Sequence, residues 1–174
     1  AMRSCLCAAL LLAAGAAASA QTVTVDARSP VFDAGRAAPT PGTDGVLPPS
    51  VALPGGCQRY VTVTNVSGSV RAFPASQPGG ADGNANYPTV TSDIDGYAGI
   101  SGVATPLIMP LLGVFLDDSV PTDPAPSDLD FIASGTDFTQ VSPGLRQVFF
   151  VGDGLTSGGA QQRFNVPEGA TRLF

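Results

Sequence analysis

The sequence predicts an all-β fold, a β-sandwich of the jelly-roll kind. Short segments of alternating or β-branched apolar residues recur along the chain, and clusters of Gly, Pro and Asp separate them. The 21 glycines and 16 prolines provide turns throughout. No segment after the signal region has the periodicity of an amphipathic helix. Many short strands joined by turns within one domain are typical of β-sandwiches.

Residues 1–20 have the organisation of a signal peptide. Arg3 supplies a positive charge, residues 6–18 form a Leu- and Ala-rich apolar run, and the small residues at 18–20 form a cleavage site. The apolar run is too short for a convincing membrane span, although an uncleaved anchor helix is the alternative. We therefore expect a secreted or cell-surface protein whose mature chain, residues 21–174, is a single domain without a membrane span.

The first half of this domain is predicted to contain three strands and two long loops. Residues 22–27 alternate between Thr and Val and form the first strand. Residues 28–56 are rich in Pro and Gly, so we interpret them as a surface loop. Residues 58–66 are the clearest strand, with Val on one face and Tyr and Thr on the other, and residues 69–73 are its expected partner. A second loop covers residues 74–88.

The second half is predicted to carry the centre of the sandwich. Residues 103–116 are mostly apolar, but two prolines exclude a helix interior, and residues 111–116 fit a buried strand. The last residues, 170–174, begin another strand, so we expect a longer protein whose C-terminal strands are missing from this chain. Further short segments between turn signals are expected at 131–132, 138–141, 148–151 and 162–167.

Composition limits the partners that this chain would bind. The formal net charge is −6, and every acidic residue except Glu168 is Asp. Asp is favoured in turns and is a good Ca²⁺ ligand, although a GC-rich genome would produce the same bias toward Asp and Arg. The lack of basic clusters argues against nucleic acid and anionic membranes as partners. Cys57 is the one cysteine after the signal region, so no internal disulfide is expected and we interpret it as a small buried hydrophobe.

The absence of histidine limits the catalytic chemistry. A Ser-His-Asp triad or a Cys-His pair needs His as the base, and the usual catalytic zinc sites need it as a ligand. Hydrolysis by a pair of carboxylates remains possible in principle, but no motif places two carboxylates across a cleft. We therefore do not expect an enzyme, and we assign no catalytic residue.

Residues 111–116, 147–156 and 162–174 resemble exported bacterial proteins with a domain similar to the galactose-binding PA-I lectin, several of which carry a C-terminal PEP-CTERM sorting segment. The resemblance runs roughly from Thr22 to the end and is most specific in the last third. It implies a small jelly-roll sandwich that holds sugar through Ca²⁺. It also implies that the calcium ligands would lie beyond Phe174, in a loop after the final strand.

Asp82, Asn84 and Tyr87 are the candidate ligand-binding residues. Their loop lies roughly where the lectin has its second sugar-contacting loop, although the lectin's His in that loop has no counterpart here. The alternatives are structural. An Asp beside Gly is common in turns, and a loop aromatic such as Tyr87 or Tyr97 often caps the core instead of stacking on a sugar. The metal ligands remain unknown.

The sequence therefore supports two functions. The first is an exported, lectin-like carbohydrate-binding module for galactosides or exopolysaccharide, with calcium-dependent binding in the complete protein. The second is a non-catalytic structural protein of the cell surface or exopolysaccharide matrix that keeps the sandwich but binds no sugar. Resemblance of fold does not decide between them, because one fold hosts many functions.

Overall fold

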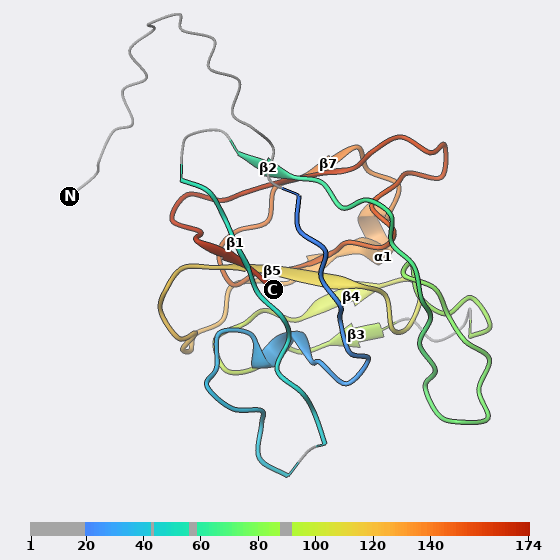
Figure 1. Ribbon diagram of the computed structural model, residues 1–174, viewed down its shortest axis with the longest axis horizontal. Helices are drawn as coiled ribbons and strands as arrows, with labels where there is room; N and C mark the ends of the chain where they lie inside the picture. The colour runs from blue at the N-terminus through green and yellow to red at the C-terminus, as the bar shows by residue number, and fades with distance from the viewer. Residues whose placement is uncertain (1–19, 43, 56–58, 88–91) are drawn as a thin grey trace, which may run out of the picture.

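The computed structural model describes residues 20–42, 44–55, 59–87 and 92–174, which form an all-β sandwich of short strands (Figure 1). This confirms the predicted fold class. The helical elements are the 3₁₀-helix η1 (Val31–Asp33) and the one-turn helix α1 (Phe131–Ser134). The strands are β1 (Val51–Ala52), β2 (Tyr60–Val61), β3 (Ser92–Ile94), β4 (Val103–Thr105), β5 (Leu112–Leu116), β6 (Leu129–Asp130), β7 (Gln140–Val141), β8 (Val148–Phe150), β9 (Arg163–Asn165) and β10 (Arg172–Leu173).

The strands form three sheets that join distant parts of the chain. The first has the order β1–β10–β5–β8 and is antiparallel throughout. The last strand of the chain therefore lies inside this sheet, where Leu173 pairs with Val51 on one side and Phe115 on the other. The sheets β2–β9–β7 and β3–β4–β6 each combine one antiparallel and one parallel pair.

The core is centred on β5 and β8. Residues 114–116 and 148–150 are buried without interruption. Because both faces of these strands are covered, the sequence shows continuous apolar runs here instead of alternation. Gly113 pairs with Phe149, and a Cβ added to Gly113 would lie 2.8 Å from Phe149 Cζ. The aromatic ring therefore packs directly over a position where only glycine leaves room.

A chain of aromatic rings connects β8 to β9 across the core. Phe149 stacks on Phe115 with 5.0 Å between ring centroids, and it lies 5.4 Å from Phe164 of β9. Phe164 meets Phe138 edge-on at 6.2 Å, and Phe138 lies 5.8 Å from Phe131. Each such ring pair stabilises a fold by about 0.5–1.5 kcal/mol beyond the burial of its area. These contacts hold the sheet β2–β9–β7 against the core.

The predicted strands are realised best in the second half. Strands β5, β8, β9 and β10 lie within the segments predicted for them. In the first half, the described residues 22–27 form no strand, and the predicted strand 58–66 is limited to β2. The predicted partner 69–73 contributes only the isolated bridge between Val70 and Gly79. Alternation gives a segment strand propensity, but a strand forms only where tertiary packing supplies a hydrogen-bonded neighbour.

One predicted strand segment is instead helical. Residues 131–132 lie in α1, where the side chain of Asp130 caps the helix by accepting from the backbone N–H groups of Ile132 and Ala133, each at 2.9 Å. Gly135 ends the turn with a φ of 78°. Four residues are too few to show helical periodicity, so only the Asp and Gly at the two ends indicate the helix in the sequence.

Some predictions fall outside the described ranges. The segment predicted to be a signal peptide, except for its last residue, and Cys57 are among the residues that the structure does not describe. Within the described part of the chain, no helix has the length and apolar character needed to cross a bilayer.

Candidate functional site

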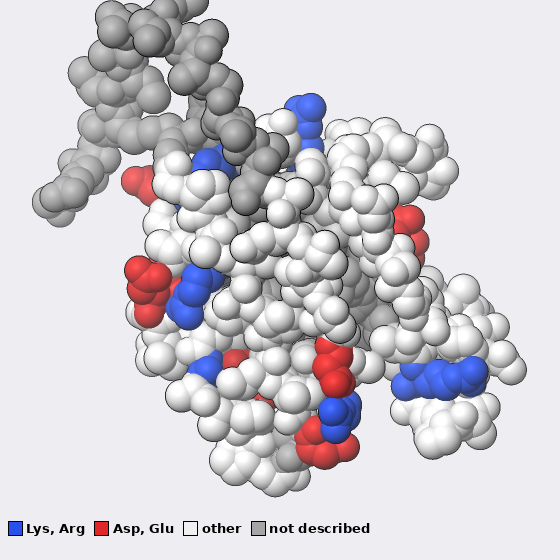
Figure 2. Space-filling view, in the orientation of Figure 1, with Lys and Arg blue, Asp and Glu red and all other residues white. Residues whose placement is uncertain are grey.

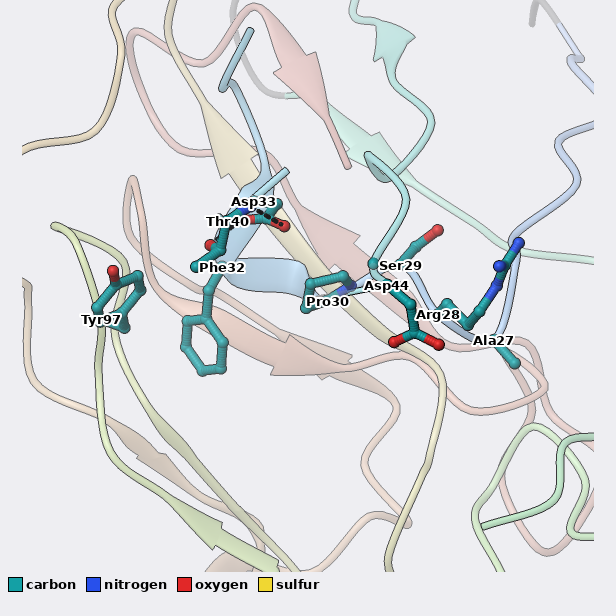
Figure 3. Close-up of a pocket in the computed structure, with 10 residues that line it drawn as sticks. Ala27, Arg28, Ser29, Pro30, Phe32, Asp33, Thr40, Asp44 and Tyr97 are labelled. Atoms are coloured by element: carbon teal, nitrogen blue, oxygen red, sulfur yellow. Dashed lines mark hydrogen bonds between the residues drawn. The ribbon is translucent and has the colours of Figure 1, made fainter. Parts of the chain in front are cut away.

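A shallow, open pocket of about 460 Å³ lies on the surface beside η1. Its walls come from residues 27–30, 32 and 33, from Thr40, Asp44 and Gly45 of the following segment, and from Tyr97, which is distant in sequence (Figure 3). Tyr97 and Phe32 lie at one end of the pocket, Arg28 and Asp44 lie toward the other, and Pro30 lies between them. Mostly apolar walls with a few polar groups are typical of small-molecule sites.

A tight turn presents Tyr97 at the pocket. Tyr97 and Ile100 exchange backbone hydrogen bonds of 2.9 and 3.1 Å, and both residues between them have a positive φ. This turn type matches the natural twist of paired strands. Gly99 packs against the backbone of Thr122 and donates its N–H to Asp123 Oδ1 at 2.8 Å, so a second loop anchors the turn. Tyr97 itself remains 52% exposed.

Arg36 contacts Tyr97 at this end of the pocket, and the carboxylate of Asp33 balances its charge. The Cζ atom of Arg36 lies 5.5 Å from the Tyr97 ring centroid, which is a cation–π distance. The Nε atom of Arg36 is 3.9 Å from Oδ1 of Asp33. Asp33 is 1% exposed, and its carboxylate accepts hydrogen bonds from the backbone N–H and the hydroxyl of Thr40 at 3.1 and 2.6 Å. The buried carboxylate therefore fixes the loop after η1 and balances the charge of Arg36.

The other end of the pocket carries an exposed ion pair and a carboxylate with unused acceptor capacity. Arg28 contacts Asp26 through Nε and Nη2, each 3.1 Å from a carboxylate oxygen. These hydrogen bonds lower the pKa of Asp26 and raise the pKa of Arg28. The Asp44 carboxylate accepts no hydrogen bond from the described residues. It is therefore available to accept hydrogen bonds from the hydroxyl groups of a ligand.

The three predicted ligand-binding residues do not line this pocket. Asn84 is fully buried, donating from Nδ2 to the carbonyl of Gln77 at 2.8 Å and accepting at Oδ1 from the backbone N–H of Asn86 at 3.0 Å. Asp82 is exposed, and Tyr87 is half-buried. The side-chain hydrogen bonds of Asn84 hold its own loop, and its backbone N–H donates to the carbonyl of Ile108 at 2.9 Å. The role of these residues in binding stays a prediction.

The carboxylates of Asp82, at the predicted site, and of Asp153 beside it form hydrogen bonds with backbone N–H groups. Asp82 Oδ1 accepts from the backbone N–H of Asp153 at 2.9 Å, and Asp153 Oδ1 accepts from that of Leu155 at 2.8 Å. The described residues contain no group of three or more His, Cys, Asp or Glu side chains that would hold a metal ion. Ca²⁺ takes 6–8 oxygen ligands, which include backbone carbonyls and water as well as carboxylates, so calcium binding by this chain stays a prediction.

The charged side chains are dispersed over one face of the molecule. On the face shown in Figure 2, acidic and basic residues occur singly or in small mixed groups, and large areas between them are uncharged. A broad field of one sign attracts polyanions or polycations, whereas an interspersed surface leaves recognition to local contacts. We therefore expect recognition to depend on individual sites such as the pocket beside Tyr97.

Sequence reasoning identified one residue of this pocket, Tyr97, and missed the rest. The Pro/Gly-rich segment at 28–56 was interpreted as a surface loop, so its lining residues Phe32 and Asp44 were not singled out. Phe32 was the available signal, since a large aromatic side chain within a surface loop needs either a core or a ligand to cover it.

Comparison with protein-family models, with curated proteins and with solved structures finds no match for this chain. The geometry of the pocket therefore carries the functional argument. The sandwich alone does not, because the same fold supports unrelated functions.

Proposed function

We propose that this chain is an exported carbohydrate-binding module and that the pocket beside Tyr97 binds a neutral sugar. The observation that carries the proposal is the exposed ring of Tyr97 beside Phe32, in an open pocket that also holds the Asp44 carboxylate. A sugar ring has an apolar face of C–H groups and a rim of hydroxyl groups. An aromatic ring packs against the apolar C–H face, and a carboxylate accepts hydrogen bonds from the hydroxyl groups.

Charge compensation favours a neutral ligand. Arg28, which lines the pocket, is paired with Asp26, and Arg36, which lies beside Tyr97, is close to Asp33. The pKa of Arg28 is raised mainly by its hydrogen bond to Asp26, and the Asp44 carboxylate adds to this only through its charge. Among the described residues the Asp44 carboxylate forms no ion pair or hydrogen bond, so its charge repels an anionic sugar. Recognition then depends on stacking against Tyr97 and on hydroxyl groups that donate to Asp44.

The predictions of export and of the kind of sugar are based on the sequence. The signal peptide predicts that the module works outside the cell, and the resemblance to the PA-I lectin makes galactosides and exopolysaccharide the first ligands to test. The same resemblance predicts calcium dependence. The described residues contain no group of three or more acidic, His or Cys side chains that would hold a metal ion, and the contacts that we propose to Tyr97 and Asp44 are formulated without a metal ion.

Calorimetric titration of the exported chain with neutral galacto-oligosaccharides tests this proposal. We expect binding by the native protein, at least tenfold weaker binding by Tyr97→Ala, and nearly native binding by Tyr97→Phe, which keeps the ring. Phe73→Ala is the matched control, because Phe73 has almost the same exposure, 53%, and is also aromatic but is not part of the pocket. Circular dichroism of each variant confirms that the sandwich is folded.

Three results would contradict the proposal. Equal losses in Tyr97→Ala and Phe73→Ala would show that the pocket is not the site. Binding that a calcium chelator abolishes in the folded protein would favour a metal-dependent site elsewhere. An absence of binding to all neutral glycans would favour the structural cell-surface protein.

A further inference from the structure

The outward face of the sheet β2–β9–β7 carries a second group of polar and aromatic side chains. In this sheet Val61, Phe164 and Val141 share one register row and are buried or half-buried. Their neighbours along the strands therefore project from the opposite face, because side chains alternate along a strand. These outward residues are Tyr60, Asn165, Arg163 and Gln140. Figure 1 shows β2 and β7 at the outer edge of the molecule.

Tyr60 and Arg163 form a stacked pair on this face. The Cζ atom of Arg163 lies 4.9 Å from the ring centroid of Tyr60, although 102 residues separate them in sequence. Both residues are exposed. Stacking on the ring restricts the guanidinium to a small range of orientations while its N–H groups still point to solvent. The guanidinium is thus positioned before any ligand arrives.

The charge of Arg163 is uncompensated. Among the described residues, its guanidinium takes part in no ion pair and donates no hydrogen bond. Its cross-strand neighbour is the neutral Gln140, which is exposed. In a chain with a formal net charge of −6, an arginine that keeps its full capacity to bind an anion is unusual. A planar guanidinium matches the geometry of a carboxylate through two parallel hydrogen bonds.

We propose that this face, centred on Arg163 and Tyr60, binds the carboxylate of a uronic acid residue in an acidic polysaccharide. Arg163 holds the carboxylate, and the amide group of Gln140 binds a neighbouring hydroxyl group, as does Oδ1 of Asn165, whose Nδ2 donates to Ser142 Oγ at 2.8 Å. The face spans three strands, about 10 Å from β2 to β7, so it accommodates adjoining sugar rings. The site is separate from the pocket beside Tyr97, and the proposal does not depend on sugar binding there.

The surroundings favour a polysaccharide over an acidic peptide. Strand β9 is hydrogen-bonded on both sides, so the centre of this face offers side chains and no free backbone groups. Extended peptides are commonly recognised by adding a strand at a sheet edge, where free backbone groups exist. A row of amide, guanidinium and aromatic side chains suits the hydroxyl and carboxylate groups of sugars instead.

Titration with a galacturonic acid hexamer and with its fully methyl-esterified form tests the proposal, because esterification replaces each charged carboxylate by a neutral methyl ester and leaves the sugar backbone the same. The exported chain should bind the acid form at least tenfold more tightly than the ester. Arg163→Gln should remove this preference. Arg163→Lys should restore only part of it, since it keeps the charge but loses the paired hydrogen bonds. Arg71→Gln is the matched control, because it removes an equal charge from an exposed loop outside both sites.

The outcomes separate this proposal from the alternatives. Native binding of the acid hexamer by Arg163→Gln, equal binding of the two probes, or no binding of either would overturn it. Equally tight, Arg163-dependent binding of a glutamate hexapeptide would also overturn the assignment to polysaccharide. Loss of neutral sugar binding in Tyr97→Ala leaves these titrations unchanged, so failure of one site is distinguishable from failure of the other.

Discussion

Two tyrosine–arginine pairs lie on the surface of this protein, Tyr97 with Arg36 and Tyr60 with Arg163. The distances between the guanidinium carbon and the ring centroid are similar, at 5.5 and 4.9 Å. Their electrostatic surroundings differ, because Arg36 lies beside the buried carboxylate of Asp33 whereas Arg163 lies opposite a neutral glutamine. We therefore propose different ligands for the two pairs, a neutral sugar beside Tyr97 and a carboxylate beside Arg163.

The two pairs also differ in what supports them. Tyr60 and Arg163 project from neighbouring strands, so the sheet register sets their separation. Tyr97 and Arg36 lie in loops, and their positions depend on tertiary contacts, namely the packing of Gly99 on Thr122 and the hydrogen bonds from Thr40 to Asp33. We conclude that charge balance decides which ligand a tyrosine–arginine pair selects, and that the scaffold decides how easily a mutation disturbs it.

The largest expected effect is on the loop-supported pair. In Gly99→Ala the new Cβ would lie 2.4 Å from the backbone of Thr122, at a φ of +84°. Overpacking and the left-handed conformation together should lower the free energy of unfolding by about 2–5 kcal/mol. Neutral sugar binding should weaken as well, because Tyr97 shifts. Urea denaturation and calorimetry measure the two effects.

Gly159→Ala is the control for this variant. Gly159 has nearly the same φ, +80°, but an added Cβ meets nothing within 4 Å. Its cost should therefore be the conformational strain alone, about 1–2 kcal/mol. If both glycine variants were equally stable, the anchoring of the Tyr97 turn on Thr122 would be refuted.

Removing the charge of Asp33 should make the Tyr97–Arg36 pair resemble the Tyr60–Arg163 pair. Asp33→Asn leaves Arg36 without its carboxylate and weakens the two bonds from Thr40, so the free energy of unfolding should fall by about 1.5–3 kcal/mol. The folded variant should gain affinity for galacturonate at the Tyr97 pocket. Asp137→Asn is the control, because Asp137 accepts the same kind of bonds from Ser157 at an exposed position without an arginine. Galacturonate binding that does not rise in Asp33→Asn would refute the compensation argument.

Adding a carboxylate beside Arg163 should make the Tyr60–Arg163 pair resemble the Tyr97–Arg36 pair. Gln140→Glu places a carboxylate opposite Arg163 in the strand register, where it competes with the ligand for the guanidinium. Galacturonate binding should fall about tenfold, which corresponds to about 1.4 kcal/mol, while stability changes little on an exposed face. Gln140→Met removes the amide without adding charge and should reduce the affinity less. Equal losses in both variants would show that the amide, and not the free charge of Arg163, determines binding.

The smallest expected effect is the pH dependence of the exposed ion pair at the pocket rim. The hydrogen bond from Arg28 holds the pKa of Asp26 below its ordinary value. A lowered pKa means that the pair stabilises the folded state above the ordinary aspartate pKa, about 3.9, and that this contribution is lost as the pH falls through the lowered pKa. Because the pair is exposed, the effect should be small. Urea midpoints of the native chain and Asp26→Asn should differ slightly at pH 7 and converge in acid.

The sequence by itself determined the all-β class and the strands at the centre of the fold. The segments at 111–116 and 148–151 are continuous apolar runs bounded by turn residues, and such runs are stable only when both faces are buried. The core strands β5 and β8 follow from that pattern. The segment at 162–167 was recognised by its alternation, which puts Phe164 in the core and Arg163 on the surface.

Tertiary structure alone decided the sites. The pocket joins Phe32 and Asp44 to Tyr97, and the second face joins Tyr60 to Arg163. Local sequence patterns specify which face of an element is apolar, but they do not specify which distant element will lie beside it. Residues 22–27 show the same limit, since their alternation predicts a strand and no described neighbour pairs with them. Pairing and juxtaposition depend on the packing of the whole chain, because the free energy that fixes them comes from burial between segments far apart in sequence.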